Sequence, residues 1–318
     1  MPGSPITIAT VVFGAEIALL EVQARSLEQS FRAADIAEIL VLDNGRRAMS
    51  PREVRRLLDA YGTLADRVRI LATTELVPEM PDAIGWRTQQ IAKLVVAERV
   101  DTPHYLLLDA KNHLIRRAGA DDLVGADGRA HGSSHSYLTH PLLPQLRTTL
   151  RFLGASPEQA DAAAADFPPT ATPFVMDTAL TRALVADVAA RAGVPFAAEF
   201  ERAGLTEFFL YAGWVQQRGP GLDAVFDGVP LPSPTVWPKA RDAAGIERAI
   251  AEAVATDSAF FAVHRTALAR GDSALRSRLA RFWVERELFP DVRAAQAAIR
   301  RFRTRYYPEM AVRRLTRR

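Results

Sequence analysis

Short, continuously apolar runs alternate with longer amphipathic stretches through the first third of the chain. Residues 6–13, 37–42 and 105–108 have the length and the aliphatic composition of buried strands. Residues 16–31 and 85–100 carry apolar side chains at helical spacing instead. Because strands and helices alternate, we predict an α/β fold with one mostly parallel, mixed sheet and helices on both of its faces.

The helix that follows the second strand has a clear start signal. Ser50 can cap this helix, Pro51 suits its first position, and Glu53 completes a capping box. We therefore predict a helix that ends near Tyr61, followed by a short strand at residues 68–72.

The second half of the chain is less regular than the first. Residues 178–192 and 207–217 are expected to be helices, residues 224–226 a short strand, and residues 260–263 the last strand. The segment after residue 270 is charged and has helical character. The chain shows no internal repeat and no low-complexity linker between independent domains. We therefore expect a single domain with C-terminal helices.

The composition narrows the chemistry that the chain can perform. Its 318 residues include no cysteine, which excludes disulfides, thiolate zinc sites and cysteine nucleophiles. No stretch approaches the roughly 18 consecutive apolar residues of a spanning helix, and the first residues lack the charged head of a signal peptide. We therefore expect a cytoplasmic protein, in which any metal is held by oxygen or imidazole ligands.

The basic residues are concentrated at the C-terminus. Residues 300–318 hold eight arginines and one acidic residue, Glu309, whereas the net charge of the whole chain is only +3. The rest of the chain is thus slightly acidic, which argues against a nucleic-acid partner. Phe302, Tyr306 and Tyr307 lie among these arginines. This composition suits peripheral contact with the anionic inner face of a membrane, and it equally suits a solvated helix end.

Several of the predicted strands end in residues that lie where parallel sheets bind ligands, outside the carboxyl ends of the strands. These strand-end residues are Phe13, Gly14, Asp43, Asn44 and Asp109. The chain contains neither the glycine-rich phosphate loops nor the nucleophile elbow of hydrolases. Only three of its 40 basic residues are lysines, and two of these, Lys93 and Lys111, fall at or beside the same edge.

Five segments, in their order and spacing, resemble a bacterial family of GT-A glycosyltransferase-like proteins associated with polysaccharide biosynthesis. They read TVVFGAE (residues 10–16), WRTQQIAKL (86–94), LLLDAKN (106–112), TEFFLY (206–211) and VHR (263–265). The resemblance implies a GT-A-like (Rossmann-like) fold. It also implies transfer of a sugar from a nucleotide-diphosphate donor.

The resemblance further implies a metal and phosphate site after the strand that ends at residue 109. In GT-A enzymes an Asp-x-Asp motif holds a divalent cation, Mn or Mg, against the donor diphosphate. Asp109 matches the first position, and His264 matches a late histidine that serves as a metal or phosphate ligand. Lys111 departs from the motif, and a lysine there can pair with the diphosphate and replace part of the charge of the metal. The metal dependence therefore stays open.

Contacts to the nucleotide-sugar donor are also implied by the resemblance. Asp43 and Asn44 match positions that read the nucleobase and the ribose, although Asp-Asn-Gly is also ordinary turn chemistry. Trp86, Gln90 and Lys93 share one helix face, which either addresses the donor or holds a buried Trp beside solvated polar groups. The complete set of donor-binding candidates is Phe13, Gly14, Asp43, Asn44, Trp86, Gln90, Lys93, Lys111 and Asn112.

An inverting transfer needs a carboxylate that takes the proton of the acceptor hydroxyl. The catalytic candidates are Glu207 and Asp177. Both also suit an ordinary helix start, since Thr206 can cap the helix that Glu207 opens and Asp177 precedes another helix. We favour Glu207 as the base and Asp177 as an acceptor contact, while a retaining mechanism needs no such base.

The resulting hypothesis is a glycosyltransferase with a carbohydrate or lipid-linked acceptor in cell-envelope or capsular polysaccharide synthesis. Residues 1–270 form the domain that binds the nucleotide-sugar and the acceptor, and residues 271–318 form a basic helical extension. The alternative is a GT-A-like protein that binds a nucleotide or glycan without catalysis, as Lys111 suggests. A third interpretation is an unrelated α/β phosphate-handling enzyme, which a different strand order favours.

Overall fold

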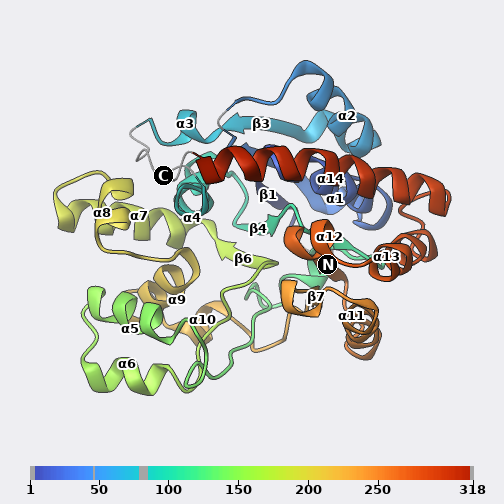
Figure 1. Ribbon diagram of the computed structural model, residues 1–318. Coiled ribbons are helices and arrows are strands. Elements are labelled where there is room, and N and C mark those ends of the chain that lie inside the picture. The colour runs from blue at the N-terminus through green and yellow to red at the C-terminus, as the bar shows by residue number, and fades with distance from the viewer. Residues whose placement is uncertain (1–3, 46, 79–84, 316–318) are drawn as a thin grey trace.

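A computed structural model describes residues 4–45, 47–78 and 85–315 of the chain. A five-stranded sheet lies at its centre (Figure 1). The strand order is β3 (Val68–Ala72), β2 (Ile36–Asp43), β1 (Ile6–Val12), β4 (His104–Asp109) and β6 (Phe174–Asp177). All neighbouring strands are parallel except β4 and β6, which are antiparallel.

The chain reverses its direction across the sheet between β1 and β4. From β1 it passes to β2 and β3 on one side, and it then returns to place β4 on the other side of β1. The connections from β1 to β2 and from β2 to β3 run toward one side of the sheet, and the connection from β3 to β4 runs back toward the other. Because such crossovers are right-handed, α1 (Ile17–Ser30) and α2 (Pro51–Tyr61) lie on one face of the sheet and α4 (Trp86–Val95) lies on the other. In such sheets, ligands bind outside the carboxyl ends of the two strands at the reversal.

Helices cover both faces of the sheet. α1 and α2 pack together, while α7 (Thr178–Ala192) and α9 (Glu207–Gln217) pack with α4. Every residue of β1 is buried, as expected for a strand that is covered on both sides. The other α-helices of the described residues before residue 260 are α3 (Thr73–Leu76), α5 (Leu143–Phe152), α6 (Pro157–Ala163), α8 (Phe196–Arg202), α10 (Leu222–Val225) and α11 (Ala243–Ala255).

A smaller, three-stranded sheet places residues from the late part of the chain beside the end of β4. Its order is β5 (Asn112–Leu114), β8 (Phe260–Val263) and β7 (Thr235–Val236). β5 follows β4 after a short turn and runs antiparallel to β8. The backbone N–H of Val263 donates to the carbonyl of Lys111 at 3.3 Å. The residues that follow β8 are therefore placed beside this turn.

In the described residues β8 is followed by the helices α12 (Arg265–Arg270), α13 (Ser273–Glu285) and α14 (Val292–Leu315). In Figure 1 α14 runs across β1 and α1, and it packs against α1, α12 and α13. Arg301 donates to Glu21 of α1 at 2.6 Å, and Arg305 pairs with Glu53 of α2. Two arginines of the basic tail are thus engaged inside the protein. In the described parts of the chain, every helix is too short or too polar to cross a membrane.

The predicted fold class is confirmed: the chain forms a mostly parallel mixed sheet with helices on both faces and additional C-terminal helices. The capping box of Ser50 and Glu53 is present. The strand predicted at residues 224–226 is wrong, because Leu222–Val225 forms a short helix. The sequence analysis does not predict β5, β6 or β7. β5 and β7 have only three and two residues, too few to show a period.

Candidate functional site

The reversal point of the sheet brings three strand ends together. Val11 of β1 lies opposite Asp109 of β4, and Val12 lies opposite Asp43 of β2. Asp109 and Asp43 therefore flank the end of β1 on its two sides, and Phe13 continues from that end. This is the edge at which the sequence predicts the donor.

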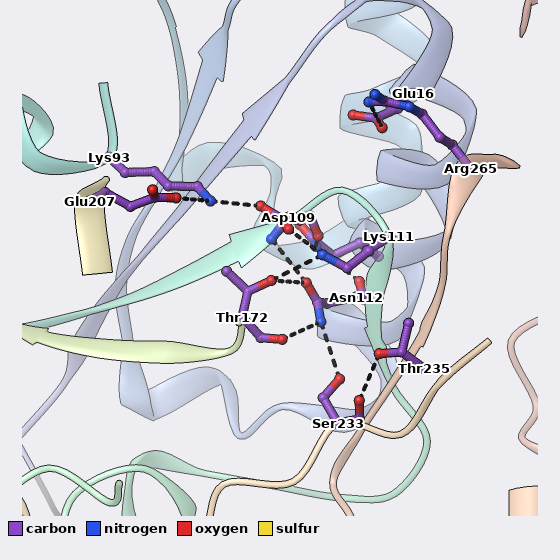
Figure 2. Close-up of polar contacts among 11 residues, drawn as sticks. Glu16, Lys93, Asp109, Lys111, Asn112, Thr172, Glu207, Ser233, Thr235 and Arg265 are labelled. Atoms are coloured by element: carbon purple, nitrogen blue, oxygen red, sulfur yellow. Dashed lines mark hydrogen bonds and ion pairs between the residues drawn. The ribbon is translucent and has the colours of Figure 1, made fainter. Parts of the chain in front are cut away.

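Asp109 is the centre of a charged cluster at this edge, formed with Lys93, Lys111 and Glu207 (Figure 2). Lys93 of α4 places its Nζ 2.9 Å from Asp109 Oδ1 and 3.2 Å from Glu207 Oε1. Lys111 forms an ion pair with the second oxygen, Asp109 Oδ2. The Asp109 cluster thus joins the end of β4 to α4 and to the first residue of α9.

The members of the Asp109 cluster shift the pKa values of one another. Burial alone raises the pKa of Asp109, but Lys111 and Lys93 outweigh burial and bring that pKa far below its usual range. Burial lowers the pKa of Lys93, yet the negative charges of Asp109 and Glu207 raise it above its usual value. Burial dominates at Glu207 and raises its pKa, while Lys93 opposes the shift. Glu207 is therefore the more basic of the two carboxylates.

Asn112 fixes the turn that carries Asp109 and Lys111. Its Oδ1 accepts from the backbone N–H of Asp109 at 3.0 Å and from the hydroxyl of Thr172 at 2.8 Å. Its Nδ2 donates to the carbonyl of Thr172 at 3.0 Å and to Ser233 Oγ at 3.2 Å. These four bonds use the full hydrogen-bonding capacity of a buried amide. Asn112 therefore positions the turn rather than a ligand.

The Asp109 cluster is buried at one end and open at the other. The side chain of Lys93 is 3% exposed and that of Glu207 is 9% exposed. The side chain of Lys111 is 16% exposed and that of Asp109 is 28% exposed. A ligand that approaches from solvent therefore meets Lys111 and Asp109 first.

A second ion pair, between Arg265 and Glu16, lies apart from the cluster (Figure 2), near enough for the charges of Asp109 and Lys111 to act on the pKa of Glu16. Arg265 Nη1 donates to Glu16 Oε1 at 2.9 Å, and the arginine side chain is 33% exposed. Its guanidinium also lies 4.8 Å from the centroid of the Phe13 ring, a cation–π contact. Burial raises the pKa of Glu16 and Arg265 opposes the shift. The open end of the site thus presents two cations, Lys111 and Arg265.

His264 lies next to Arg265 and is committed to the helix that follows. Its Nδ1 accepts the backbone N–H of Thr266 at 3.1 Å, which makes His264 the N-cap of α12. Burial, with the positive charges of Arg265 and Lys111, lowers the pKa of His264 to about 4, so its imidazole is neutral near pH 7. The ring lies 5.9 Å from that of Trp237, centroid to centroid.

The residues of this site do not fit a metal ion. Across residues 4–45, 47–78 and 85–315, no three His, Asp or Glu side chains are grouped so as to hold one. Lysines hold both oxygens of Asp109, so a metal cation there would face two ammonium groups. The geometry therefore gives no support to Asp109 and His264 as metal ligands. Lys111 stands where the second carboxylate of an Asp-x-Asp motif is expected.

Asp43 and Asn44, the predicted nucleobase and ribose contacts, are engaged by the protein itself. The Asp43 carboxylate accepts the backbone N–H of Gly45 at 3.0 Å and that of Met49 at 2.9 Å. The side chain of Asn44 forms hydrogen bonds with Thr73, Gly85 and Thr88. The bond from Gly45 to Asp43 is the turn chemistry that Asp-Asn-Gly also predicts. The bonds of Asn44 tie the end of β2 to α3 and α4.

The other donor-binding candidates lie in different surroundings. Gln90 lies on α4 and is fully buried, whereas the side chain of Trp86 is outside the described part of the structure. Gly14 is covered by α14, since a Cβ added to it would lie 2.9 Å from Glu309 Oε2. The end of β1 is therefore reached by the C-terminal helix as well as by Arg265.

Asp177, the predicted acceptor contact, lies at the opposite end of β4 from Asp109. Because β6 runs antiparallel to β4, Asp177 pairs with His104 at the start of β4, whereas Asp109 ends that strand. The Asp177 carboxylate accepts the backbone N–H of Leu180 at 2.8 Å and caps α7. The ordinary helix-start interpretation is the one that the structure shows.

The sequence analysis does not assign a role to four residues whose side chains form hydrogen bonds in the site: Glu16, Thr172, Ser233 and Arg265. Glu16 and Arg265 fall inside segments that carry the family resemblance, so their charge is a usable signal. Thr172 and Ser233 lie in loops, where no period points to them. The predicted cap by Thr206 is wrong, because its buried hydroxyl has no hydrogen-bond partner among the described residues.

A model of a protein family of unknown function, DUF6492, matches residues 5–233. The chain belongs to this family. The part that matches the DUF6492 family includes the whole Asp109 cluster, while His264 and Arg265 lie beyond it. No curated protein matches the chain.

Several solved structures resemble the chain at low sequence identity. The galactosyltransferase LgtC in complex with donor and acceptor sugar analogs is 13% identical with a TM-score of 0.49, over 88% of this chain and 100% of that chain. An active-site mutant of LgtC is 14% identical with a TM-score of 0.48, over 81% and 87%. Glucosyl-3-phosphoglycerate synthase from Mycobacterium tuberculosis, in complex with Mn²⁺, uridine diphosphate and phosphoglyceric acid, is 14% identical with a TM-score of 0.38, over 69% and 66%.

Proposed function

We propose that this protein is a glycosyltransferase that moves a sugar from a nucleotide-diphosphate donor to an acceptor. The observation that carries the proposal is the Asp109 cluster at the reversal point of the sheet, with Lys111 and Arg265 at its open end. This edge is where α/β sheets bind ligands. The segments that form it are those that resemble GT-A glycosyltransferases.

The two cations at the open end suit the diphosphate of the donor. When the bond between sugar and diphosphate breaks, its electron pair stays on the phosphate oxygen, and the leaving group gains negative charge. Asp109 and Thr172 anchor the ammonium of Lys111, which stays partly exposed. Arg265 supplies a planar guanidinium nearby. We assign to this pair the charge neutralisation that a divalent metal provides in Asp-x-Asp enzymes.

Glu207 is the proton acceptor in this proposal. The acceptor hydroxyl attacks the sugar carbon opposite the leaving diphosphate, a new glycosidic bond forms, and the hydroxyl proton passes to a carboxylate. This path inverts the sugar carbon. The raised pKa of Glu207 makes it a stronger base than an exposed glutamate, and its contact with Lys93 fixes its orientation.

Substitution of Asp109 tests this assignment. Asp109→Ala removes the anchor of Lys111, so we expect turnover to fall by about two orders of magnitude, in line with the loss of one preorganised electrostatic group. The measurement is release of nucleoside diphosphate from a panel of nucleotide-sugars. Asp177→Ala serves as the matched control, since it removes a carboxylate at the opposite edge of the sheet. Unchanged turnover in Asp109→Ala contradicts the assignment.

A second candidate function is binding of a nucleotide or glycan without catalysis. One observation favours it: lysines hold both oxygens of Asp109, which makes the cluster a closed ion-pair network. Calorimetric titration with nucleoside diphosphates, with and without manganese, followed by a donor-hydrolysis assay, separates the two functions. Nucleotide binding without turnover supports the second candidate.

The wider role follows from the family resemblance and the charge of the tail. We propose a cytoplasmic enzyme of cell-envelope or capsular polysaccharide synthesis with a carbohydrate or lipid-linked acceptor and no nucleic-acid partner. Residues 1–270 bind donor and acceptor, and residues 271–318 form the basic extension. Arg301 and Arg305 are engaged internally, while Arg300 is exposed and available for an anionic membrane face.

A further inference from the structure

A surface hollow lies near His264, outside the Asp109 cluster. It has a volume of about 650 Å³ and is formed by the short helix η6 (Pro238–Ala240), the residues that follow it, and the end of α12. Its lining residues are Pro238, Lys239, Arg241, Asp242, Arg270 and Asp272. Trp237 directly precedes η6 and is 49% exposed. We call the lining residues together with Trp237 the Trp237 platform.

We propose that the Trp237 platform binds an anionic saccharide, a sugar that carries a carboxylate or a phosphate, as the acceptor of the transfer. The role of acceptor rests on the glycosyl transfer proposed above, whereas saccharide binding can be measured without it.

The cations of the platform are available to a ligand. Lys239, Arg241 and Arg270 are all exposed, and within the described residues none of them has an ion-pair partner. Lys93 and Lys111, in contrast, are each paired with a carboxylate. A carboxylate or phosphate placed among the three free cations forms charge-assisted hydrogen bonds, which are the strongest that a protein surface offers.

Two carboxylates on the platform favour a ligand that also carries hydroxyl groups. Asp242 Oδ1 accepts the backbone N–H of Gly245 at 2.7 Å, and Asp272 Oδ1 accepts that of Leu275 at 2.7 Å. These bonds cap α11 and α13 and hold both carboxylates in place. The remaining oxygens can accept from sugar hydroxyls. They repel a ligand that presents only negative charge, such as a bare polyanion.

Trp237 supplies a face for the sugar ring and places the platform beside the proposed donor site. Its indole lies 5.9 Å from the His264 ring, centroid to centroid, and Trp237 is half exposed. An exposed aromatic face takes up the apolar C–H face of a saccharide. His264 is followed by Arg265, the second cation of the proposed donor site. His264 therefore adjoins the platform through Trp237 and the proposed donor site through Arg265.

Calorimetric titration with glucuronic acid, glucose 6-phosphate, glucose and inorganic phosphate tests the platform. We expect both anionic sugars to bind about tenfold or more tightly than glucose, since one charge-assisted contact contributes at least that factor. Trp237→Ala is expected to weaken both anionic sugars about fivefold and to leave inorganic phosphate unchanged. Lys239→Ala/Arg270→Ala is expected to weaken them at least tenfold.

The matched control is Arg55→Ala/Arg99→Ala, which removes the same charge from two exposed arginines of other elements. It should bind the anionic sugars as the wild type does. The proposal is overturned if glucose binds as tightly as glucuronic acid, if Trp237→Ala has no effect, or if the control loses as much affinity as the platform variant. Lys111→Ala should leave sugar binding intact while it weakens nucleoside diphosphates, so failure of the platform and failure of the donor site are distinguishable.

Discussion

The Asp109 cluster and the Trp237 platform both contain several cations. In the cluster the lysines form ion pairs with carboxylates, whereas the cations of the platform form none with the described residues. In the cluster, Lys93 is 3% exposed and contacts two carboxylates, Asp109 and Glu207. On the platform, Lys239 and Arg270 are exposed, and the described residues offer them no ion-pair partner. The charge of the first group is balanced inside the protein and supports the fold. The charge of the second group is free for a ligand.

Lys111 stands between these two extremes. It is paired with Asp109 and held near Thr172, yet 16% of its side chain is exposed. Its ammonium is therefore both anchored by the protein and accessible to an anion. This combination is what a preorganised phosphate ligand requires.

Removal of Lys93, the cation that contacts both Asp109 and Glu207, should cause the largest loss of stability. Lys93→Met leaves Asp109 and Glu207 as two carboxylates without their shared cation, so we expect the free energy of unfolding to fall by about 3–5 kcal/mol. Urea denaturation monitored by circular dichroism measures this change. In Lys93→Met/Glu207→Gln one uncompensated charge is absent, and part of the loss should be recovered. Wild-type stability in Lys93→Met would show that the cluster does not support the fold.

The ion pair between α14 and α2 should contribute less, and in a pH-dependent way. Burial by itself raises the pKa of Glu53, but hydrogen bonds from Ser50 and Arg305 outweigh it and lower that pKa to about 2. Because the folded pKa is below the unfolded one, this stabilisation is complete above about pH 4.5 and is lost as the pH falls towards 2. Glu53→Gln should cost about 1–2 kcal/mol at pH 7. Denaturation curves at pH 7 and pH 2 should show that the difference in unfolding free energy between the wild type and Glu53→Gln disappears in acid. An equal difference at both pH values would contradict the stabilising role of the Glu53 charge.

The platform should contribute least to stability. Lys239→Ala/Arg270→Ala removes two exposed cations without an internal partner, so we expect a change within about 0.5 kcal/mol. The same denaturation experiment checks this value. A loss as large as that of Lys93→Met would mean that these cations have a structural role, and the contrast between the two groups would disappear.

Local sequence signals suffice for β1 to β4, for β8 and for one half of the site. The apolar run that ends at Asp109, followed by Lys111 and Asn112, is readable from the chain, because strand periodicity and turn chemistry are local. The position of Asp177 is not readable, since the direction of β6 depends on its pairing with β4. A residue at the end of a strand lies at the ligand edge only when that strand runs parallel to its neighbours.

The partners inside the site are also beyond local reasoning. Lys93 and Glu207 are 114 positions apart, and Glu16 and Arg265 are 249 positions apart. Their contacts depend on how α4 packs against α9 and on how the smaller sheet returns β8 to the end of β4. Such packing has no periodic signature, so the sequence can nominate the charged residues but cannot pair them.

The central claim, that lysine rather than a metal meets the donor diphosphate, is tested most directly by one titration. Uridine, guanosine, cytidine and thymidine diphosphates are titrated calorimetrically into the wild type, Lys111→Ala and Lys111→Asp, each with EDTA and with manganese. We predict that the wild type binds one of them equally in both media and that Lys111→Ala binds it about 10–100 times more weakly in both. Lys111→Asp, which completes an Asp-x-Asp motif, should bind only with manganese. Wild-type binding that requires manganese, or Lys111→Ala that binds as tightly as the wild type, would contradict the claim.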